Sequence, residues 1–573
     1  MMNPERRFDG PAFFWLFLFV WYFSGLPQIL YLLSGTGRME DLLATLPLSL
    51  FWLAVALFLP PARQRLALGV IGLLLWAASL VSLGYFGIHG DPMTQSVVFA
   101  MFESNPEESR EFFSQYLTWQ LVGGLSLYTL SAFLLWKRLR PAALPRARVI
   151  PVCALLLAIS ACYPLLTRDH TVEKAQNRLR AAMPWPILTG YCQYNRQLAR
   201  LRERLAGKTP LLAQLEDVSG DAPRALVLVV GESTTSLRMS LYGYPRPTSP
   251  RLEALRADGL TVFADVIAPR PYTIEVLQQA LTFAHQKAPR RFLDEPSLID
   301  LMRQAGYKTF WITNQQTMNR DSLLTFFARQ ADETRYLNRQ FQQDANQFDE
   351  IVLDPFARAL QDPARKKFIV VHLLGAHIKY QYRYPKSFDR FEGKEHAPPG
   401  LDAAKLAQYN AYDNAMLYND FIVSRLIETF TRQAANGFLL YFSDHGEEVF
   451  DTAPHQTLGR NEDAPTPGMY RVPFLLWTSP SWRTAHPRDF QGMTGRKYST
   501  EHLIHTWSDL AGLRYDRYQP ELSVTNPAFR EFTRWIGNPD GKLEDFDGMC
   551  WQCGAHKDSG KPEEAPARRK TGR

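Results

Sequence analysis

Five stretches near the start of the chain contain no Asp, Glu, Lys or Arg. They cover residues 11–34, 42–60, 66–88, 118–136 and 149–167. Each is close to the length at which an α-helix crosses ~30 Å of hydrocarbon, so the sequence predicts five membrane spans. The lack of ionisable residues argues against a transporter, whose translocation path needs such groups. The first stretch also lacks a small-residue cleavage pattern and is too long for a cleavable signal peptide.

Cysteine is also scarce, at five of 573 residues. Cys153 and Cys162 fall in the fifth span, where we expect them to pack as apolar side chains. Cys550 and Cys553 form a CWQC motif near the C-terminus. We interpret this motif as a disulfide, with a redox pair or part of a metal site as the alternatives. The role of Cys192 stays open.

Positive charge is rare in alternate loops between the spans, which hold only Arg38 and Arg110. The other loops are basic; they contain Arg6, Arg7, Arg63, Arg65, Lys137, Arg138, Arg140, Arg146 and Arg148. The positive-inside rule therefore predicts a cytoplasmic N-terminus and places everything after residue 167 outside. In a Gram-negative cell this is an inner-membrane protein with a periplasmic domain. The formal net charge of +7 then reflects topology, and we expect no nucleic-acid partner.

Two external segments lie between the spans and the soluble domain. The linker 168–220 is rich in Arg and aromatic residues, which is typical of an interfacial helix on anionic lipid, although a solvated linker is the alternative. The loop 89–117 is acidic and aromatic. It either covers an active site at the membrane or lies on the lipid surface.

Strand-like and helix-like runs alternate over residues 221–538. The expected strands are 225–230, 261–267, 308–313, 367–373, 437–443 and 472–477, and the expected helices are 248–259, 298–305, 403–432 and 501–512. This alternation predicts an α/β domain with a largely parallel sheet covered on both faces. Residues 539–573 form a polar C-terminal tail that carries the CxxC motif.

Acids and histidines follow several of these strands. They are Glu232, His377, Asp444, His445 and, ten residues further on, His455. Because the carboxyl ends of parallel strands meet at one edge of a sheet, these residue types predict a divalent metal site of the zinc type. His372 lies inside an apolar run, and we interpret it as a core histidine.

Thr273 is the candidate nucleophile. It follows Pro271 and directly precedes a helical pattern, so its hydroxyl would face free backbone N–H groups. An ordinary helix cap is the alternative. Thr273 lies in the sequence between the first strand and the DHG motif at 444–446, both of which carry predicted metal ligands. This position favours catalysis, because metal coordination lowers the pKa of a hydroxyl.

The order of short motifs resembles a known family. GES at 231, PYT at 271, GAH at 375, SDHGEE at 443 and PH at 454 are similar to the membrane-anchored phosphoethanolamine transferases of the alkaline-phosphatase superfamily. The likeness spans nearly the whole chain and is greatest for the branch that modifies the lipopolysaccharide core.

This resemblance implies a role for each residue that matches a family motif. Glu232, Thr273, Asp444 and His445 fall where the family binds zinc, with Thr273 as nucleophile. His377, His455 and, in the loop 89–117, Asn105 fall where the family contacts substrate; a second metal is the alternative for the two histidines. One tightly bound Zn²⁺ is implied, a second during catalysis is left open, and Mn²⁺ or Mg²⁺ is not excluded.

The resemblance also implies the substrates. Phosphatidylethanolamine would donate phosphoethanolamine to the threonine, and a core heptose phosphate of lipopolysaccharide would accept it. The protein is expected to act as a monomer among membrane lipids. The alternatives are a headgroup transferase acting on lipid A, a periplasmic glucan or another glycan, or a non-catalytic lipid-binding scaffold. A sulfatase is disfavoured, because the Thr273 region lacks the Cys or Ser followed by x-Pro-x-Arg that formylglycine needs.

Overall fold

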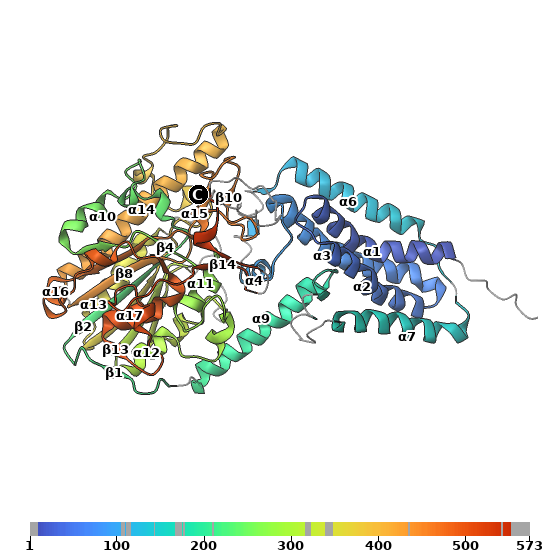
Figure 1. The fold of residues 1–573 in the computed structure, drawn as a ribbon. Coiled ribbons are helices and arrows are strands. Elements are labelled where there is room, and N and C mark those ends of the chain that lie inside the picture. Colours follow the sequence, from blue (N-terminus) through green and yellow to red (C-terminus); the bar gives the residue numbers. More distant parts are fainter. Residues whose placement is uncertain are drawn as a thin grey trace, which may run out of the picture.

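The structure is a computed structural model. It describes residues 10–104, 109–110, 116–142, 144–166, 175, 178–208, 211–315, 322–338, 348–433, 436–539 and 542–551. Helices from the first part of the chain form a bundle on one side of the molecule, and a globular α/β domain lies on the other (Figure 1). Helix α9 (Trp185–Glu203) runs between the two parts.

The membrane bundle confirms the five predicted spans. They are α1 (Gly10–Leu33), α2 (Met39–Phe58), α3 (Pro61–His89), α6 (Trp119–Arg138) and α7 (Arg146–Cys162). Helix α2 packs against α1 and α7, while α3 packs against α1 and α6. Phe19, Val20 and Leu75 lie in the bundle core, whereas Leu127 and Leu155 are exposed, as side chains that face lipid would be.

A seven-stranded sheet forms the centre of the globular domain. Its order is β3 (Leu260–Val262), β11 (Phe474–Thr478), β8 (Gly437–Ser443), β2 (Arg224–Gly231), β7 (Lys366–His372), β5 (Lys308–Thr313) and β6 (Glu333–Tyr336). Within this sheet only β11 runs antiparallel to its neighbours, so the predicted largely parallel sheet is confirmed. The expected strand 261–267 is split, because β4 (Val266–Ile267) leaves this sheet to pair with β12 (Tyr498–Ser499).

The central strand β2 shows why both faces of the sheet are covered. All eight of its residues are buried, as a continuous apolar run predicts. Leu226 and Leu228 pack in one core with α11 (Thr273–Ala280), α12 (Leu298–Gln304) and α17 (Leu503–Ala511). Val227 and Val229 alternate to the opposite core, with α10 (Pro250–Leu255), α13 (Leu353–Gln361) and α14 (Ala403–Arg432).

The loop after α3 packs on the catalytic domain. Its helix α4 (Gln95–Glu103) contacts α9, and Phe99 joins the same buried core as Leu226. Glu103 accepts hydrogen bonds from the Tyr194 hydroxyl at 2.7 Å and from the Leu323 N–H at 2.8 Å. The described part of the loop therefore packs on the globular domain.

The folded domain continues beyond the predicted boundary at residue 538. Strands β14 (Trp535–Gly537) and β15 (Leu543–Asp545) form a hairpin across that boundary. The buried guanidinium of Arg534 bonds Asp547 at 2.6 and 2.9 Å, and Phe546 is buried. Residues up to Trp551 thus belong to the packed domain, because this hairpin buries apolar surface. Cys550 forms a disulfide, and Cys553 lies outside the described residues.

Candidate metal and phosphoryl-transfer site

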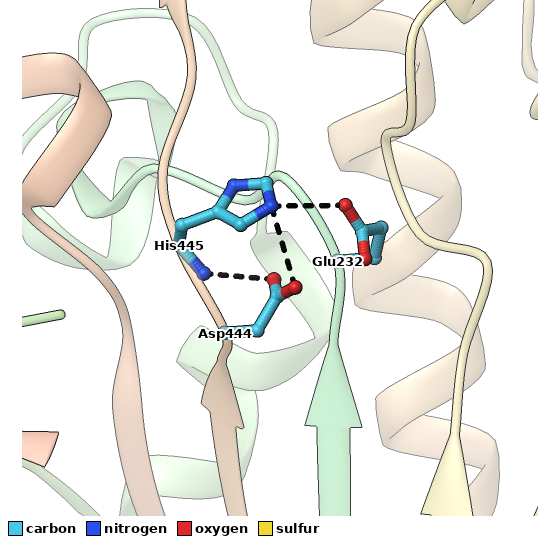
Figure 2. A group of neighbouring side chains, drawn as sticks. All are labelled: Glu232, Asp444 and His445. Atoms are coloured by element: carbon cyan, nitrogen blue, oxygen red, sulfur yellow. Dashed lines mark hydrogen bonds and ion pairs between the residues drawn. The ribbon is translucent and has the colours of Figure 1, made fainter. Parts of the chain in front are cut away.

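The neighbouring strands β2 and β8 bring two acids together at the end of the sheet. Gly231 pairs with Ser443 in register, so Glu232 and Asp444 leave the sheet side by side, and His445 follows (Figure 2). All three side chains are buried. The backbone of Gly375 touches that of Glu232 so closely that a Cβ there would lie 2.5 Å from the Glu232 carbonyl oxygen. The glycine of GAH is therefore a packing requirement, and its φ of +57° adds to it.

The side-chain atoms of the cluster converge on one point. His445 Nε2 lies 3.1 Å from Glu232 Oε1 and 3.3 Å from Asp444 Oδ2. His445 Nδ1 lies 2.9 Å from the Gly446 carbonyl, which requires the proton on Nδ1 and leaves the lone pair on Nε2. One ligand atom from each of the three residues lies within 4.8 Å of the others.

Thr273 joins this cluster from another element. It is the first residue of α11, and its hydroxyl donates to Glu232 Oε2 at 3.1 Å and lies 3.3 Å from His445 Nε2. The structure thus brings together Glu232, Thr273, Asp444 and His445, which are distant in sequence.

The electrostatics of the two acids fit a cation. Burial and the charge of Glu232 hold the pKa of Asp444 well above its usual value. Burial also acts to raise the pKa of Glu232, but the adjacent His445 outweighs it and the net shift is downward. Asp444 Oδ2 is buried and has no hydrogen-bond partner. Two carboxylates, an imidazole lone pair and a hydroxyl form a donor set that suits zinc, so these residues fit the predicted metal.

Three further residues lie beside this cluster and were not predicted as site residues. Arg460 Nη1 contacts His445 Nε2, and its Nε lies 3.3 Å from Glu447 Oε2. Burial raises the pKa of Glu447 to about 7. Gln315 Nε2 donates to Glu232 Oε2 at 3.4 Å. Glu447 could have been found as part of DHGEE, and Gln315 from its position two residues after β5, whereas Arg460 has no such signal.

The other predicted residues are less closely placed. His377 is near enough to Glu232 for that charge to act on it, although burial lowers the pKa of His377 to about 3. His455 binds the Phe450 carbonyl at 2.8 Å, and in the described part of the chain no hydrogen bond or ion pair joins it to the cluster. His372 is buried, with its ring 6.1 Å from that of Trp311, as a core histidine would be. Asn105 lies outside the described residues.

Comparison with known proteins places the chain in a family. The sulfatase family matches residues 224–513. The phosphoethanolamine transferase EptC of Escherichia coli strain K12 is 51% identical over 564 residues, which cover 96% of this chain and 98% of that protein. The C-terminal periplasmic domain of the Escherichia coli EptC, solved in complex with Zn, is 59% identical and has a TM-score of 0.59 over 60% of this chain and 97% of that chain.

A second solved structure covers the membrane part as well. The integral membrane lipooligosaccharide phosphoethanolamine transferase EptA of Neisseria meningitidis has the same fold, with a TM-score of 0.63 over 91% of this chain and 99% of that chain at 18% identity. Its likeness extends through the bundle and the sheet domain together. The chain belongs to the membrane-anchored phosphoethanolamine transferases of the sulfatase and alkaline-phosphatase superfamily.

Proposed function

We propose that this phosphoethanolamine transferase moves phosphoethanolamine from phosphatidylethanolamine to lipopolysaccharide, with a core heptose phosphate as acceptor. The observation that carries the proposal is the Thr273 hydroxyl, 3.1 Å from Glu232 Oε2 and 3.3 Å from His445 Nε2 at the edge of a buried acidic cluster. The EptC relatives are named phosphoethanolamine transferases, which supports phosphoethanolamine as the group that this enzyme transfers. The enzyme works as a monomer in the inner membrane, with the catalytic domain in the periplasm.

Glu232, Thr273, Asp444 and His445 would hold one zinc ion. When bound, such an ion lowers the pKa of a coordinated hydroxyl and offsets negative charge on phosphoryl oxygens. The Zn complex of the Escherichia coli relative supports this choice of metal. We leave a second ion, and Mn²⁺ or Mg²⁺ in place of zinc, outside the proposal.

The residues of the chain divide the reaction into two displacements. Thr273 Oγ attacks the donor phosphorus, the bond from phosphorus to the diacylglycerol oxygen breaks, and diacylglycerol leaves after taking up a proton. Glu232, which already accepts the Thr273 hydroxyl proton in a hydrogen bond, orients the nucleophile. An acceptor oxygen then attacks the same phosphorus and restores the Thr273 hydroxyl. His377 and His455 are proposed to contact the phosphoethanolamine group.

No nucleotide is needed for this exchange. The membrane phospholipid itself supplies the phosphoryl group, so the transfer uses no ATP outside the cytoplasm. The α4 segment packed on the domain and the adjoining bundle keep the catalytic sheet beside the membrane that contains the donor.

A Thr273→Ala variant tests the proposal, with Thr273→Ser as the matched control that keeps a hydroxyl. The full-length proteins are incubated with phosphatidylethanolamine vesicles, and the peptide containing residue 273 is analysed by mass spectrometry. We expect the mass of one phosphoethanolamine on the wild type and the serine variant, and none on the alanine variant. Lipopolysaccharide from a deletion strain carrying each variant shows the acceptor position. Normal lipopolysaccharide modification by Thr273→Ala would reject the nucleophile.

A further inference from the structure

Two short segments of the catalytic domain reach the imidazole of His445. One ends at Thr273 and the other contains Arg460, and each places a polar side chain against His445 Nε2. The residues that flank these two side chains reach another part of the molecule. They contact the end of α3 and the residues that follow it, which belong to the membrane domain.

The membrane domain holds the Thr273 segment at two points. Tyr85, in the last turns of α3, lies beside Tyr272, the residue before Thr273. Ser96 Oγ, at the start of α4, accepts a hydrogen bond of 2.9 Å from Arg270 Nη2. The Arg270 guanidinium is 4% exposed, so its bond to Ser96 is desolvated.

The Arg460 segment is held by the residue that follows Arg460. Asn461 Nδ2 donates to Asp91 Oδ2 at 2.9 Å and to the His89 carbonyl at 3.2 Å. Asn461 and Asp91 are both buried. The next residue, Glu462, accepts a 2.8 Å bond from Arg270 Nη2. The two segments are therefore tied to each other as well as to the membrane domain.

We propose that the docked end of α3 is a positioning element for the reaction, with Tyr85, Asp91 and Asn461 as positioning residues. Tyr85 acts through Tyr272 to fix Thr273 relative to His445. Asp91 and Asn461 fix the neighbouring Arg460 relative to the same imidazole. The proposal rests on the proposed function, because it assigns these residues to the transfer through Thr273. Loss of a docking contact frees a segment that ends one residue from a reacting group, and a misplacement of about 1 Å there costs on the order of 100-fold in rate.

Two Tyr→Phe variants of the full-length enzyme give the first test. Tyr85→Phe removes the hydroxyl that lies beside Tyr272. Tyr194→Phe is the matched control, because it removes a tyrosine hydroxyl that reaches from α9 to Glu103, away from both segments. We expect Tyr85→Phe to lower kcat for phosphoethanolamine transfer at least about tenfold with KM for phosphatidylethanolamine unchanged. Tyr194→Phe should keep kcat within about twofold of the wild type, since its bond reaches no reacting segment.

A swap across the second contact gives a rescue test. Asn461→Asp places two carboxylates opposite each other, so we expect a drop in kcat larger than that of Tyr85→Phe. Adding Asp91→Asn restores an amide opposite a carboxylate and should recover most of the rate. Hydrogen exchange of the metal-free proteins gives a readout independent of turnover: peptides covering 270–273 and 458–462 should exchange faster in Asn461→Asp and return to the wild-type rate in the double variant.

The outcomes separate the two proposals. An active wild type together with an unimpaired Tyr85→Phe and an unimpaired Asn461→Asp would overturn the positioning role and leave the transfer through Thr273 standing. An equal loss in Tyr85→Phe and Tyr194→Phe would also overturn it, because the effect would then be general to the interface. A wild type that never carries phosphoethanolamine on Thr273 would instead reject the proposed function itself.

Discussion

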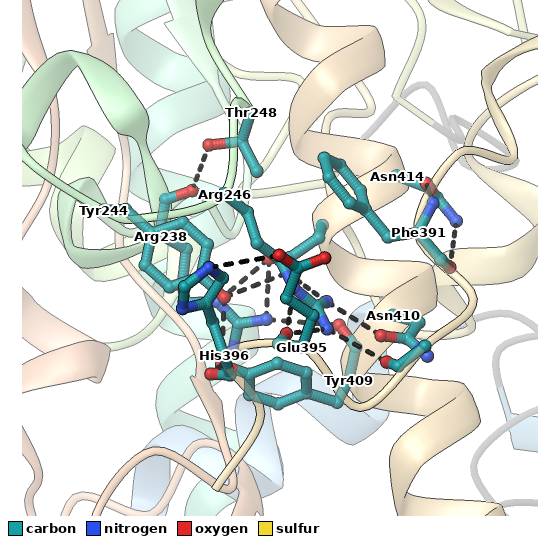
Figure 3. A network of polar contacts seen from close by, with 12 residues as sticks. Arg238, Tyr244, Arg246, Thr248, Phe391, Glu395, His396, Tyr409, Asn410 and Asn414 are labelled. Atoms are coloured by element: carbon teal, nitrogen blue, oxygen red, sulfur yellow. Dashed lines mark hydrogen bonds and ion pairs between the residues drawn. The ribbon is translucent and has the colours of Figure 1, made fainter.

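Two buried charged clusters lie in the catalytic domain, and they are built in opposite ways. In the paired cluster, Arg238 and Arg246 lie beside Tyr409 (Figure 3). Asp413 lies between their guanidiniums: Oδ1 accepts from Arg238 at 2.6 and 2.9 Å, and Oδ2 accepts from Arg246 at 2.8 Å. The Tyr244 hydroxyl adds a bond of 2.9 Å to Oδ2. In the acidic cluster, Glu232 and Asp444 face one imidazole, and Asp444 Oδ2 has no hydrogen-bond partner.

The difference shows what each cluster is for. A buried carboxylate with a positively charged partner on each oxygen has all its hydrogen bonds satisfied, and it holds the surrounding loops in place. Here Asp413 ties α14 to the loop that carries Arg238 and Arg246, and cations also stack on Tyr409. In the acidic cluster two buried carboxylates share one histidine and one oxygen of Asp444 has no hydrogen-bond partner, which is the state expected of residues that bind a metal.

The largest effect should come from breaking the paired cluster. Asp413→Asn removes the negative charge that pairs with the buried guanidiniums of Arg238 and Arg246. Removing one partner of a buried ion pair costs about 3–5 kcal/mol, so we expect a loss of that size in the free energy of unfolding. Denaturant unfolding of the wild type and the variant measures it. A loss below about 1 kcal/mol would show that Asp451, which also bonds Arg238, suffices alone.

A smaller effect should appear as a pH dependence at Glu447. Its pKa is about 7 in the folded protein because of burial, against 4.5 for an exposed glutamate. The folded state therefore keeps a proton that the unfolded state has lost, and stability falls as pH rises from about 4.5 to about 7. The full shift corresponds to roughly 3 kcal/mol. Glu447→Gln should flatten this decline when unfolding is measured with chelator at pH 5 and pH 8; an unchanged slope would refute it.

The smallest effect on stability should come from the same kind of change in the acidic cluster. Glu232→Gln removes one of two facing carboxylates, so without metal we expect a change of less than about 1 kcal/mol. Zinc should raise the Tm of the wild type, because a ligand that binds only the folded state stabilises it, and the variant should lose most of that rise. Differential scanning with and without zinc measures both quantities. A variant destabilised as much as Asp413→Asn would erase the contrast between the clusters.

The strands and the cluster could be predicted from the sequence because they depend on local patterns. The apolar run before Gly231 fixed β2, and the DHG motif after β8 placed Asp444 and His445 at the same edge. Arg460 could not be predicted, since its contact with His445 depends on how a distant segment folds back onto the cluster. Gln315 lies two residues after β5 and was missed because an amide is not a typical zinc ligand. The hairpin at residues 535–545 was missed for a related reason: Arg534 and Phe546 are stabilised by contacts with distant residues, which no local pattern encodes.

The length of α3 has a consequence for how a lipid meets the enzyme. With 29 residues, it spans about 44 Å at ~1.5 Å per residue, whereas hydrocarbon is ~30 Å thick. The helix is thus longer than the hydrocarbon layer, and we expect its last turns, which lie beside the segment that ends at Thr273, to reach the headgroup layer. The end of α3 would therefore set the height of Thr273 relative to the bilayer. In the proposed transfer, a phospholipid would present its phosphodiester at that height while its acyl chains stay in the leaflet, and no step that extracts the donor would be needed.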